Sequence, residues 1–367
     1  MTKNKKENVV VVGAGYGGLR AALSLAPHVN VTVVDPADRF TERVRLHEKA
    51  TGRADVTHSL RRFLDPAGVT HIPAKVTRID TASAQAHTDD GRILHYDRLV
   101  YALGSRTATV GGPETERVYT AESAAELHKR LLDGPGSLTV VGGGLTGIEL
   151  ATELAEFDPR WEIRLVTGGE IAPSVSKAGR AHIRSVLLAR GVRIEENRRV
   201  TDPGDIETDV VVWSASMVPN TELAIDAGLT VETNGRIKVD SALRSVSHHG
   251  IYVAGDAAAA STPKSGPLRM ACATALPLGA HAATSVLRDL RGEEPQPLKF
   301  AYAAQCISLG RHDGLFQPVR ADDSPRDRIL TGKPAAVVKE QIVRTTVRTI
   351  SLAARFPAVA RLIPGVN

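Results

Sequence analysis

One stretch, from Val9 to Asp35, constrains the fold of this 367-residue chain more than any other. It begins with four consecutive valines, which predict a short buried strand. Gly13, Gly15 and Gly18 follow with the spacing GxGxxG, and a helical segment and a second apolar strand lead to the acid. An acid about 20 residues after such glycines is typical of a unit that binds a dinucleotide. The sequence therefore predicts a dinucleotide-binding βαβ unit rather than an ordinary βαβ turn.

Each residue type in this motif has a physical task. Gly13 allows a tight turn, Gly15 leaves room for a pyrophosphate against the backbone, and Gly18 lets the helix approach the strand. The N–H groups and the positive dipole end of the helix attract phosphates. Asp35 can accept hydrogen bonds from ribose hydroxyls. The other loop residues expected to contact the cofactor are Ala14, Tyr16 and Gly17.

The motif recurs 129 residues later, where Gly142, Gly144 and Gly147 follow an apolar strand and precede a helix and a second strand. Two such units in one chain indicate nucleotide binding far more specifically than a single unit does. The copy differs at its end, because Thr167 stands where the first unit has its acid. Either Glu170 reaches the ribose, or the site without an acid accepts the 2′-phosphate of NADPH.

Composition excludes several other functions. The net charge is +5 and only 4% of residues are aromatic, and we find no nucleic-acid-binding signature, so we expect no nucleic acid partner. The two cysteines, Cys272 and Cys306, are too few for a disulfide framework and indicate a reducing cytoplasm and places in the core. The histidines lack metal-ligand spacing, so we expect no metal site. No apolar run is long enough for a transmembrane helix.

Further motifs lie between and after the two units. The segment YDRLVYALGS covers residues 96–105, and IYVAGD covers residues 251–256. Residues 69–75 predict a strand, and Asp-Gly at 90–91 predicts a β-hairpin. The basic stretch after Asp35, which includes Arg43, is either a solvated loop or a contact for phosphate or flavin. A small-residue-rich helix is expected over residues 270–292.

These motifs, in this order, resemble those of the flavoprotein reductases with two dinucleotide-binding domains, the pyridine nucleotide-disulfide oxidoreductases. Within them, the chain is similar to type II NADH:quinone dehydrogenases and to apoptosis-inducing-factor-like and ferroptosis-suppressor-like quinone reductases. The resemblance extends over about residues 8–320. It implies an α/β fold of two Rossmann-like, three-layer domains, the second inserted in the first, plus a short C-terminal region. The implied ranges are 1–106 and 241–300 for FAD, 107–240 for NAD(P)H, and 301–367 for the C-terminal region.

The resemblance also implies roles for individual residues. FAD would be bound by the first glycine motif and by a set of further residues, with Asp256 accepting a ribityl hydroxyl. That further set is Asp35, Arg43, Val76, Ala102, Gly104, Ser105, Gly255 and Asp256. Gly142, Gly144 and Gly147 would bind NAD(P)H. Two residues are implied in catalysis: Glu149 near the nicotinamide, or else a helix-surface acid, and Lys264 near the flavin, or else a free surface lysine.

The implied reaction transfers a hydride from NAD(P)H to N5 of FAD and then two electrons to a quinone-like acceptor. Disulfide reductase chemistry is disfavoured because the cysteine pair that such reductases carry on the helix of the first unit is missing, and the stretch directly after Asp35 has no cysteine either. One departure weakens the quinone assignment, because CATALPLGAH lacks the glutamine that bacterial type II dehydrogenases carry there; Gln305 or Gln317 could serve instead. Two alternatives stay open: a reductase of a ferredoxin-like protein, and a non-catalytic redox sensor.

The tail, residues 337–364, predicts a basic amphipathic helix in which Arg344, Arg348 and Arg355 share one face. Such a helix either lies on an anionic membrane surface or packs on the body of the protein. We therefore expect a cytoplasmic protein, with peripheral attachment to the inner face of the membrane as an alternative. A homodimer is also compatible with the resemblance.

Overall fold

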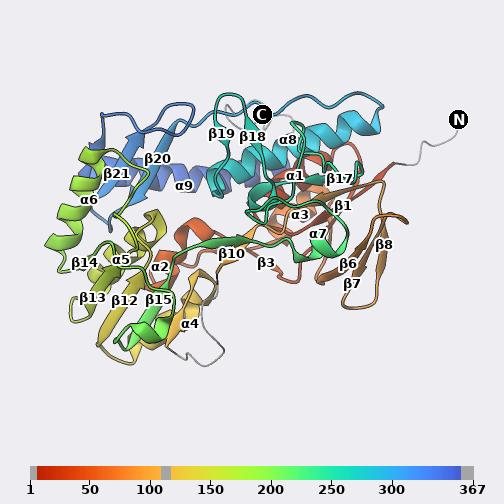
Figure 1. Ribbon diagram of the computed structural model, residues 1–367. Coiled ribbons are helices and arrows are strands. Elements are labelled where there is room, and N and C mark those ends of the chain that lie inside the picture. Colours follow the sequence, from red (N-terminus) through yellow and green to blue (C-terminus); the bar gives the residue numbers. More distant parts are fainter. Residues whose placement is uncertain (1–5, 109–116, 357–367) are drawn as a thin grey trace, which may run out of the picture.

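The computed structural model describes residues 6–108 and 117–356 and contains two parallel-sheet units (Figure 1). In the view of Figure 1, β12, β13 and β15 lie at the lower left, and β1 and β17 lie at the right. A long helix, α9, runs across the molecule from the C-terminal strands toward the first unit. The carboxyl ends of the parallel strands β1 and β12 position the two glycine motifs.

The first sheet is parallel throughout, with the strand order β5–β2–β1–β9–β17. Its valines are buried because helices and loops cover the sheet on both faces, as is usual for parallel sheets. The strands are β1 (Asn8–Val12), β2 (Asn30–Val34), β5 (Thr70–Ile72), β9 (Arg98–Tyr101) and β17 (Ile251–Val253). The strand expected over residues 69–75 is shorter, because Pro73 has no N–H to continue the ladder.

Two helices of the first unit, α1 (Tyr16–Leu25) and α8 (Cys272–Leu290), pack unusually close together. A Cβ atom at Gly279 would lie 2.2 Å from the carbonyl oxygen of Gly17, so only glycine fits at this contact. The helix predicted over residues 270–292 is therefore confirmed, with Pro277 inside it. Its position beside α1 brings the segment after β17 to the first glycine motif.

The second sheet repeats the first, with the order β11–β15–β12–β13–β14 and parallel pairing throughout. The central register also repeats, since Val12 lies opposite Val34 in one sheet and Val141 opposite Val166 in the other. The strands are β11 (Val118–Tyr119), β12 (Ser137–Val141), β13 (Glu162–Val166), β14 (Arg193–Glu195) and β15 (Val210–Trp213). The helices are α4 (Ala124–Leu132), α5 (Leu145–Phe157) and α6 (Lys177–Ala189).

The second unit is inserted between two strands of the first. The chain leaves the first sheet after β9, builds the second sheet, and returns as β17. The two crossings, β10 (Ser105–Thr107) and β16 (Met217–Pro219), pair as an antiparallel ribbon. The predicted α/β fold with an inserted second unit is thus confirmed, whereas the residue limits given for the domains stay a prediction.

Smaller elements surround the sheets. The predicted hairpin is confirmed within an antiparallel sheet of β6 (Val76–Asp80), β7 (Gln85–Thr88) and β8 (Ile93–His95). The stretch after Asp35 was expected to be a loop but contains regular structure, because Phe40 is buried against Tyr16, with ring centroids 4.9 Å apart. The elements there are β3 (Arg39–Thr41), β4 (Thr57–Ser59), α2 (Leu46–Ala50) and α3 (Arg61–Leu64). Others are α7 (Glu222–Asp226), β18 (Ser261–Thr262) and β19 (Gly266–Pro267).

The C-terminal part consists of an antiparallel sheet and α9 (Gly332–Arg355). The strands are β20 (Ala304–Ser308), β21 (Gly314–Pro318) and β22 (Leu330–Thr331). The predicted tail helix is present but begins earlier, at Gly332, and residues 357–364 lie outside the described part of the chain. Its apolar side packs on β21 and α1, while Arg344, Arg348 and Arg355 are exposed. No helix within the described residues combines the length and apolar character needed to cross a membrane.

Candidate functional site

The first glycine motif forms a tight loop between β1 and α1. Gly13 has φ +102°, and a Cβ atom there would lie 2.6 Å from the Ala102 carbonyl oxygen. A Cβ atom at Gly18 would lie 1.9 Å from the carbonyl oxygen of Gly13. By contrast, nothing lies within 4 Å of a Cβ position at Gly15, where α1 begins without a side-chain cap. The loop is thus closed toward the sheet and open in front, where the free N–H groups can receive a pyrophosphate.

Asp35, directly after β2, is held beside this loop. Its Oδ2 accepts a hydrogen bond from the Ala14 N–H at 2.7 Å, and its Oδ1 accepts one from the Ala37 N–H at 2.9 Å. These bonds fix the carboxylate over the glycine loop and leave lone pairs on both oxygens. The orientation suits a carboxylate that accepts hydrogen bonds from a ribose.

Three segments of the first unit meet at Asp256. Ser105, after β9, donates from its Oγ to Asp256 Oδ2 at 2.7 Å. Asp256 Oδ1 is buried and has no hydrogen-bond partner among the described residues. Its neighbour Gly255 has φ +74° and lies beside Gly17 of α1, since a Cβ atom at Gly17 would be 3.3 Å from the Gly255 nitrogen. A buried carboxylate oxygen without a donor is costly unless a ligand supplies one, so this position fits a cofactor hydroxyl.

The other residues predicted at the flavin site lie around this centre or apart from it. Ala102 is buried and bonds to β1 through its N–H, and Gly104 has φ +63°. Val76 is buried at the start of β6. Arg43 forms an ion pair with Glu122 of the second unit at 2.8 Å. Lys264 is exposed in the turn between β18 and β19.

The second glycine motif reproduces the first. Gly142 has φ +126°, and a Cβ atom at Gly147 would lie 2.0 Å from its carbonyl oxygen. Gly144 has open space in front of it and begins α5 without a side-chain cap. The acid differs, as expected from the sequence: Thr167 follows β13, and the carboxylate of Glu170 pairs with Arg180. The chain therefore holds two glycine loops of the same construction, each open in front of a helix N-terminus.

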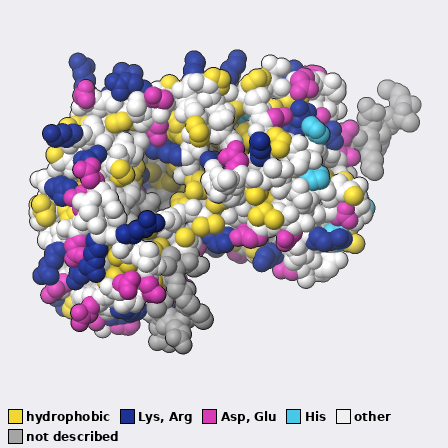
Figure 2. Space-filling model, viewed as in Figure 1, with side chains coloured by type: hydrophobic (Ala, Val, Ile, Leu, Met, Phe, Trp, Pro, Cys, Tyr) yellow, Lys and Arg dark blue, Asp and Glu magenta, His cyan; other side chains and the backbone are white. Residues whose placement is uncertain are grey.

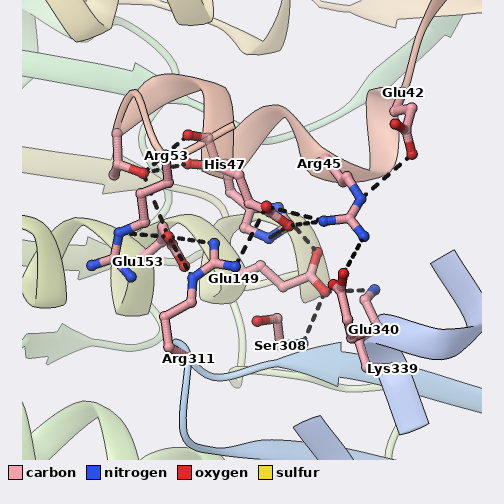
Figure 3. Close-up of polar contacts among 12 residues, drawn as sticks. Glu42, Arg45, His47, Arg53, Glu149, Glu153, Ser308, Arg311, Lys339 and Glu340 are labelled. Carbon is pink, nitrogen blue, oxygen red and sulfur yellow. Dashed lines mark hydrogen bonds and ion pairs between the residues drawn. The ribbon is translucent and has the colours of Figure 1, made fainter. Parts of the chain in front are cut away.

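Glu149, on α5, lies in a buried polar contact with α9 (Figure 3). It accepts hydrogen bonds from Lys339 Nζ at 2.9 Å and from the Ser308 N–H at 3.0 Å, and His47 Nδ1 lies 4.0 Å away. Its side chain is only 10% exposed, and that of Lys339 is 16% exposed. The alternative interpretation of Glu149 as a helix-surface acid is therefore wrong. The position of Glu149 relative to a nicotinamide stays a prediction.

The protonation states of this group follow from burial and pairing. Burial alone would raise the pKa of Glu149, but the Lys339 ammonium brings it below its ordinary value. Burial alone would lower the pKa of Lys339, but the Glu149 carboxylate raises it. Burial lowers the pKa of His47. At neutral pH the pair is therefore ionised beside a neutral imidazole.

The Glu149–Lys339 pair is part of a larger cluster that joins both units to α9 (Figure 3). Glu153, with a fully buried side chain, pairs with Arg311 at 2.7 Å and Arg53 at 3.3 Å. Arg45 contacts three carboxylates, those of Glu42, Glu48 and Glu340. A groove of about 540 Å³ borders the cluster, and His47, Glu48, Ser308, Arg311 and Lys339 line part of it. Figure 2 shows the surface hollowed between the two parallel-sheet units.

The sequence did not predict Lys339 as the partner of Glu149. A signal was present, because Lys339 stands at the i+4 spacing of the buried residues Ala335, Val343 and Val347 on α9. A lysine in line with a buried face needs a buried counter-charge. The two glutamines considered as alternatives, Gln305 and Gln317, instead hold the C-terminal sheet to the segment before α6 by bonding to Ser174 and Ser176.

Two expectations concern absent features. Within the described ranges, no three histidine, cysteine or acidic side chains are grouped so that they could hold a metal ion. Cys272 and Cys306 are both free and partly buried.

Known proteins resemble the chain over most of its length. An NADH dehydrogenase-like protein of Mycobacterium tuberculosis is 29% identical, over 91% of this chain and 92% of its own. Ferroptosis suppressor protein 1 of Taeniopygia guttata is 28% identical, over 84% and 88%. A type II NADH:quinone oxidoreductase of Staphylococcus haemolyticus is 27% identical, over 93% and 95%. These relatives confirm the resemblance expected from the motifs.

A solved structure and a family model agree with these relatives. The sulfide:quinone oxidoreductase structure from Aquifex aeolicus superposes with a TM-score of 0.79 over 98% of this chain and 96% of its own, at 19% identity. The model of the pyridine nucleotide-disulphide oxidoreductase family matches residues 7–276, which include both glycine cradles and the Gly255–Asp256 turn. The chain therefore belongs to the pyridine nucleotide-disulphide oxidoreductase family.

Proposed function

We propose that this oxidoreductase is an FAD-dependent NAD(P)H dehydrogenase that reduces a quinone-like acceptor. The observation that carries the proposal is the unpartnered oxygen of Asp256, buried beside the first of two phosphate cradles. FAD, when bound, accepts a hydride from NAD(P)H and passes two electrons to an acceptor.

The residues of the first unit have distinct tasks toward FAD. The glycine loop and the N-terminus of α1 would bind the pyrophosphate, and Asp35 would accept hydrogen bonds from the ribose. Asp256 would accept a hydrogen bond from a ribityl hydroxyl through Oδ1, while Ser105 holds Oδ2 in place. Arg43 and Val76 remain proposed contacts, although Arg43 is already paired with Glu122.

The second unit would bind the electron donor. Gly142, Gly144 and Gly147 form the cradle for its pyrophosphate. Glu149 lies two residues after the last of these glycines, on the first turns of α5. We propose that it positions the nicotinamide end of the donor. Its pairing with Lys339 fixes the side chain, which is what a positioning role requires.

The groove beside Lys339 is our candidate acceptor site. Reduction of a quinone to a quinol needs two protons as well as two electrons, and Lys339 holds a proton at Nζ on the groove wall. Among the relatives, the Staphylococcus haemolyticus protein is named for a quinone acceptor. Peripheral membrane attachment through the exposed arginines of α9 and a homodimer remain proposals, and Lys264 remains a proposed flavin contact.

The test combines a spectrum with an acceptor panel. The purified protein should be yellow and release FAD on denaturation, and anaerobic NADH or NADPH should bleach the flavin. Reoxidation is then followed with menaquinone, ubiquinone and a ferredoxin. Turnover with a quinone supports the proposal. Turnover with ferredoxin alone contradicts the acceptor, and bleaching without turnover by any acceptor indicates a redox sensor. A colourless protein that FAD cannot reconstitute contradicts the whole proposal.

A further inference from the structure

We propose that the second nucleotide site is built for the 2′-phosphate of NADPH and that Arg199 is the residue that binds it. The inference rests on the proposed function, because it names the donor of that reaction. It concerns the C-terminal edge of the second sheet, where β13 and β14 end (Figure 1).

The residue after β13 differs in charge from its counterpart in the first unit. Val34 pairs with Val12 in the first sheet, and the next residue is Asp35. Val166 pairs with Val141 in the second sheet, and the next residue is Thr167. The two positions are therefore structurally equivalent. A carboxylate at this position binds the ribose 2′-hydroxyl and repels a 2′-phosphate, whereas threonine carries no charge.

The threonine also faces the cradle. A Cβ atom at Gly143, in the glycine loop, would lie 2.7 Å from Thr167 Oγ1. The side chain thus occupies the same place relative to its loop as Asp35, which accepts a hydrogen bond from the Ala14 N–H. The hydroxyl can donate a hydrogen bond to a phosphate oxygen, which a carboxylate cannot do.

An arginine, Arg199, lies close to this position. The chain turns at Asn197, which has φ +58°, and the Arg198 N–H donates to the Thr167 carbonyl at 3.0 Å. This turn lays Arg199 against Gly168, since its Cα, Cβ and Cγ atoms lie 3.6–3.7 Å from a Cβ position there. The next residue, Gly169, has no atom within 4 Å of its Cβ position, so the chain is open on that side of the loop.

The acids around Arg199 are paired with other arginines. Three carboxylates lie in this region, and each has an arginine partner: Glu170 pairs with Arg180, Glu195 with Arg198, and Glu196 with Arg184. Arg199 is exposed and has no ion-pair partner among the residues that the structure describes. Its planar guanidinium can bind a phosphate through two N–H groups, and no carboxylate of the described residues lies within ion-pair distance of it.

These three features predict a preference for NADPH over NADH, which the names of the relatives do not state. We expect kcat/KM for NADPH to exceed that for NADH by at least about tenfold, because one bidentate charged contact is made only with the 2′-phosphate. In Arg199→Ala this preference should fall by about 10- to 100-fold, with kcat/KM for NADH within twofold of the wild type. In Thr167→Asp the preference should reverse.

A binding measurement tests the site independently of turnover. Calorimetric titration of the full-length protein with adenosine 2′,5′-bisphosphate and with 5′-AMP compares ligands that differ in the 2′-phosphate. The wild type should bind the bisphosphate at least about tenfold more tightly, and Arg199→Ala should bind both alike. Arg199→Lys should keep part of the difference, because lysine retains the charge but not the fork. The matched control is Arg193→Ala, an arginine of β14 whose side chain is 71% exposed, and it should behave as the wild type.

The outcomes separate this inference from the proposed function. Equal binding of the two ligands by the wild type would overturn the inference, as would equal effects of the Arg199 and Arg193 variants. Exclusive use of NADH with quinone turnover would overturn it while leaving the proposed function intact. Failure to bind FAD or to reduce any acceptor contradicts the proposed function, yet the titration still decides whether Arg199 binds a 2′-phosphate.

Discussion

At the scale of single residues, Asp256 carries more information than any glycine. Its carboxylate has one oxygen held by Ser105 and one buried oxygen without a donor among the described residues. Burying an acceptor without a partner costs about 1–3 kcal/mol. Stability alone does not account for such a group at the meeting point of β9, β17 and α1, whereas the cofactor hydroxyl that we propose there would supply the missing donor.

Replacing this residue should weaken FAD binding. In Asp256→Ala we expect FAD affinity to fall by about 10- to 100-fold, because a hydrogen bond to a charged group contributes about 1.5–3 kcal/mol. The fall is measured by titrating FAD into flavin-stripped protein. Asp322→Ala, which removes an exposed aspartate from a turn, is the control. An unchanged FAD affinity in the Asp256 variant would contradict the assignment, provided that its thermal unfolding matches that of the control.

At the scale of elements, α9 joins the two units through charges as well as through apolar packing. Its buried face contacts β21 and α1, and Lys339 on that face reaches Glu149 of α5. A buried ion pair adds little stability by itself, but removing one partner leaves an uncompensated charge. The contact therefore makes the position of α9 depend on the second unit.

A double-mutant cycle measures this coupling. Glu149→Gln and Lys339→Met should each lower the free energy of unfolding by about 3–5 kcal/mol, because each leaves the other charge buried. The double variant should lose clearly less than the sum of the two, since no unpaired charge remains. Urea unfolding gives the three values. Glu162→Gln, at an exposed pair with Arg193, should change stability by less than about 1 kcal/mol. Additive losses in the cycle would show that the pair is not coupled.

The same elements show what could be predicted from the sequence. Both βαβ units and the tight turns at Gly13 and Gly142 were predicted, because strand, glycines and helix lie within one short stretch. The cluster around Glu149 was not, because Lys339 lies 190 residues away and only the packing of α9 brings it near. The structured stretch around Phe40 was also missed, because the packing of Phe40 against Tyr16 and Phe63 outweighs its polar neighbours.

At the scale of the whole molecule, the two units are connected by the ribbon of β10 and β16, by the buried cluster around Glu153, and by an exposed ion pair. Arg43 of the first unit lies 2.8 Å from Glu122 of the second, and Glu122 also accepts a hydrogen bond from the Thr107 N–H. Burial alone would raise the pKa of Glu122, but the bond from Arg43 lowers it to about 2. The relative position of the units thus depends partly on this carboxylate being ionised.

The lowered pKa of Glu122 determines how its contribution to stability changes with pH. Because the folded pKa of Glu122 lies below its ordinary value of 4.5, its contribution is complete above that pH and is lost as the pH falls toward 2. Both side chains are more than a third exposed, so we expect about 1 kcal/mol or less. The difference in unfolding free energy between the wild type and Glu122→Gln should therefore shrink between pH 5 and pH 2.5. A difference that grows toward acid pH would contradict the ion pair.

The insertion of one unit into the other also sets an order of events during synthesis. The first sheet lacks its strand β17, and the proposed FAD site lacks Gly255 and Asp256, until the ribosome has made the whole second unit. Domains generally fold as units during synthesis. The proposed NAD(P)H site is therefore complete in a nascent chain whose proposed FAD site is not yet formed. We expect such a chain to form the proposed nicotinamide site first and to bind FAD only at the end of synthesis.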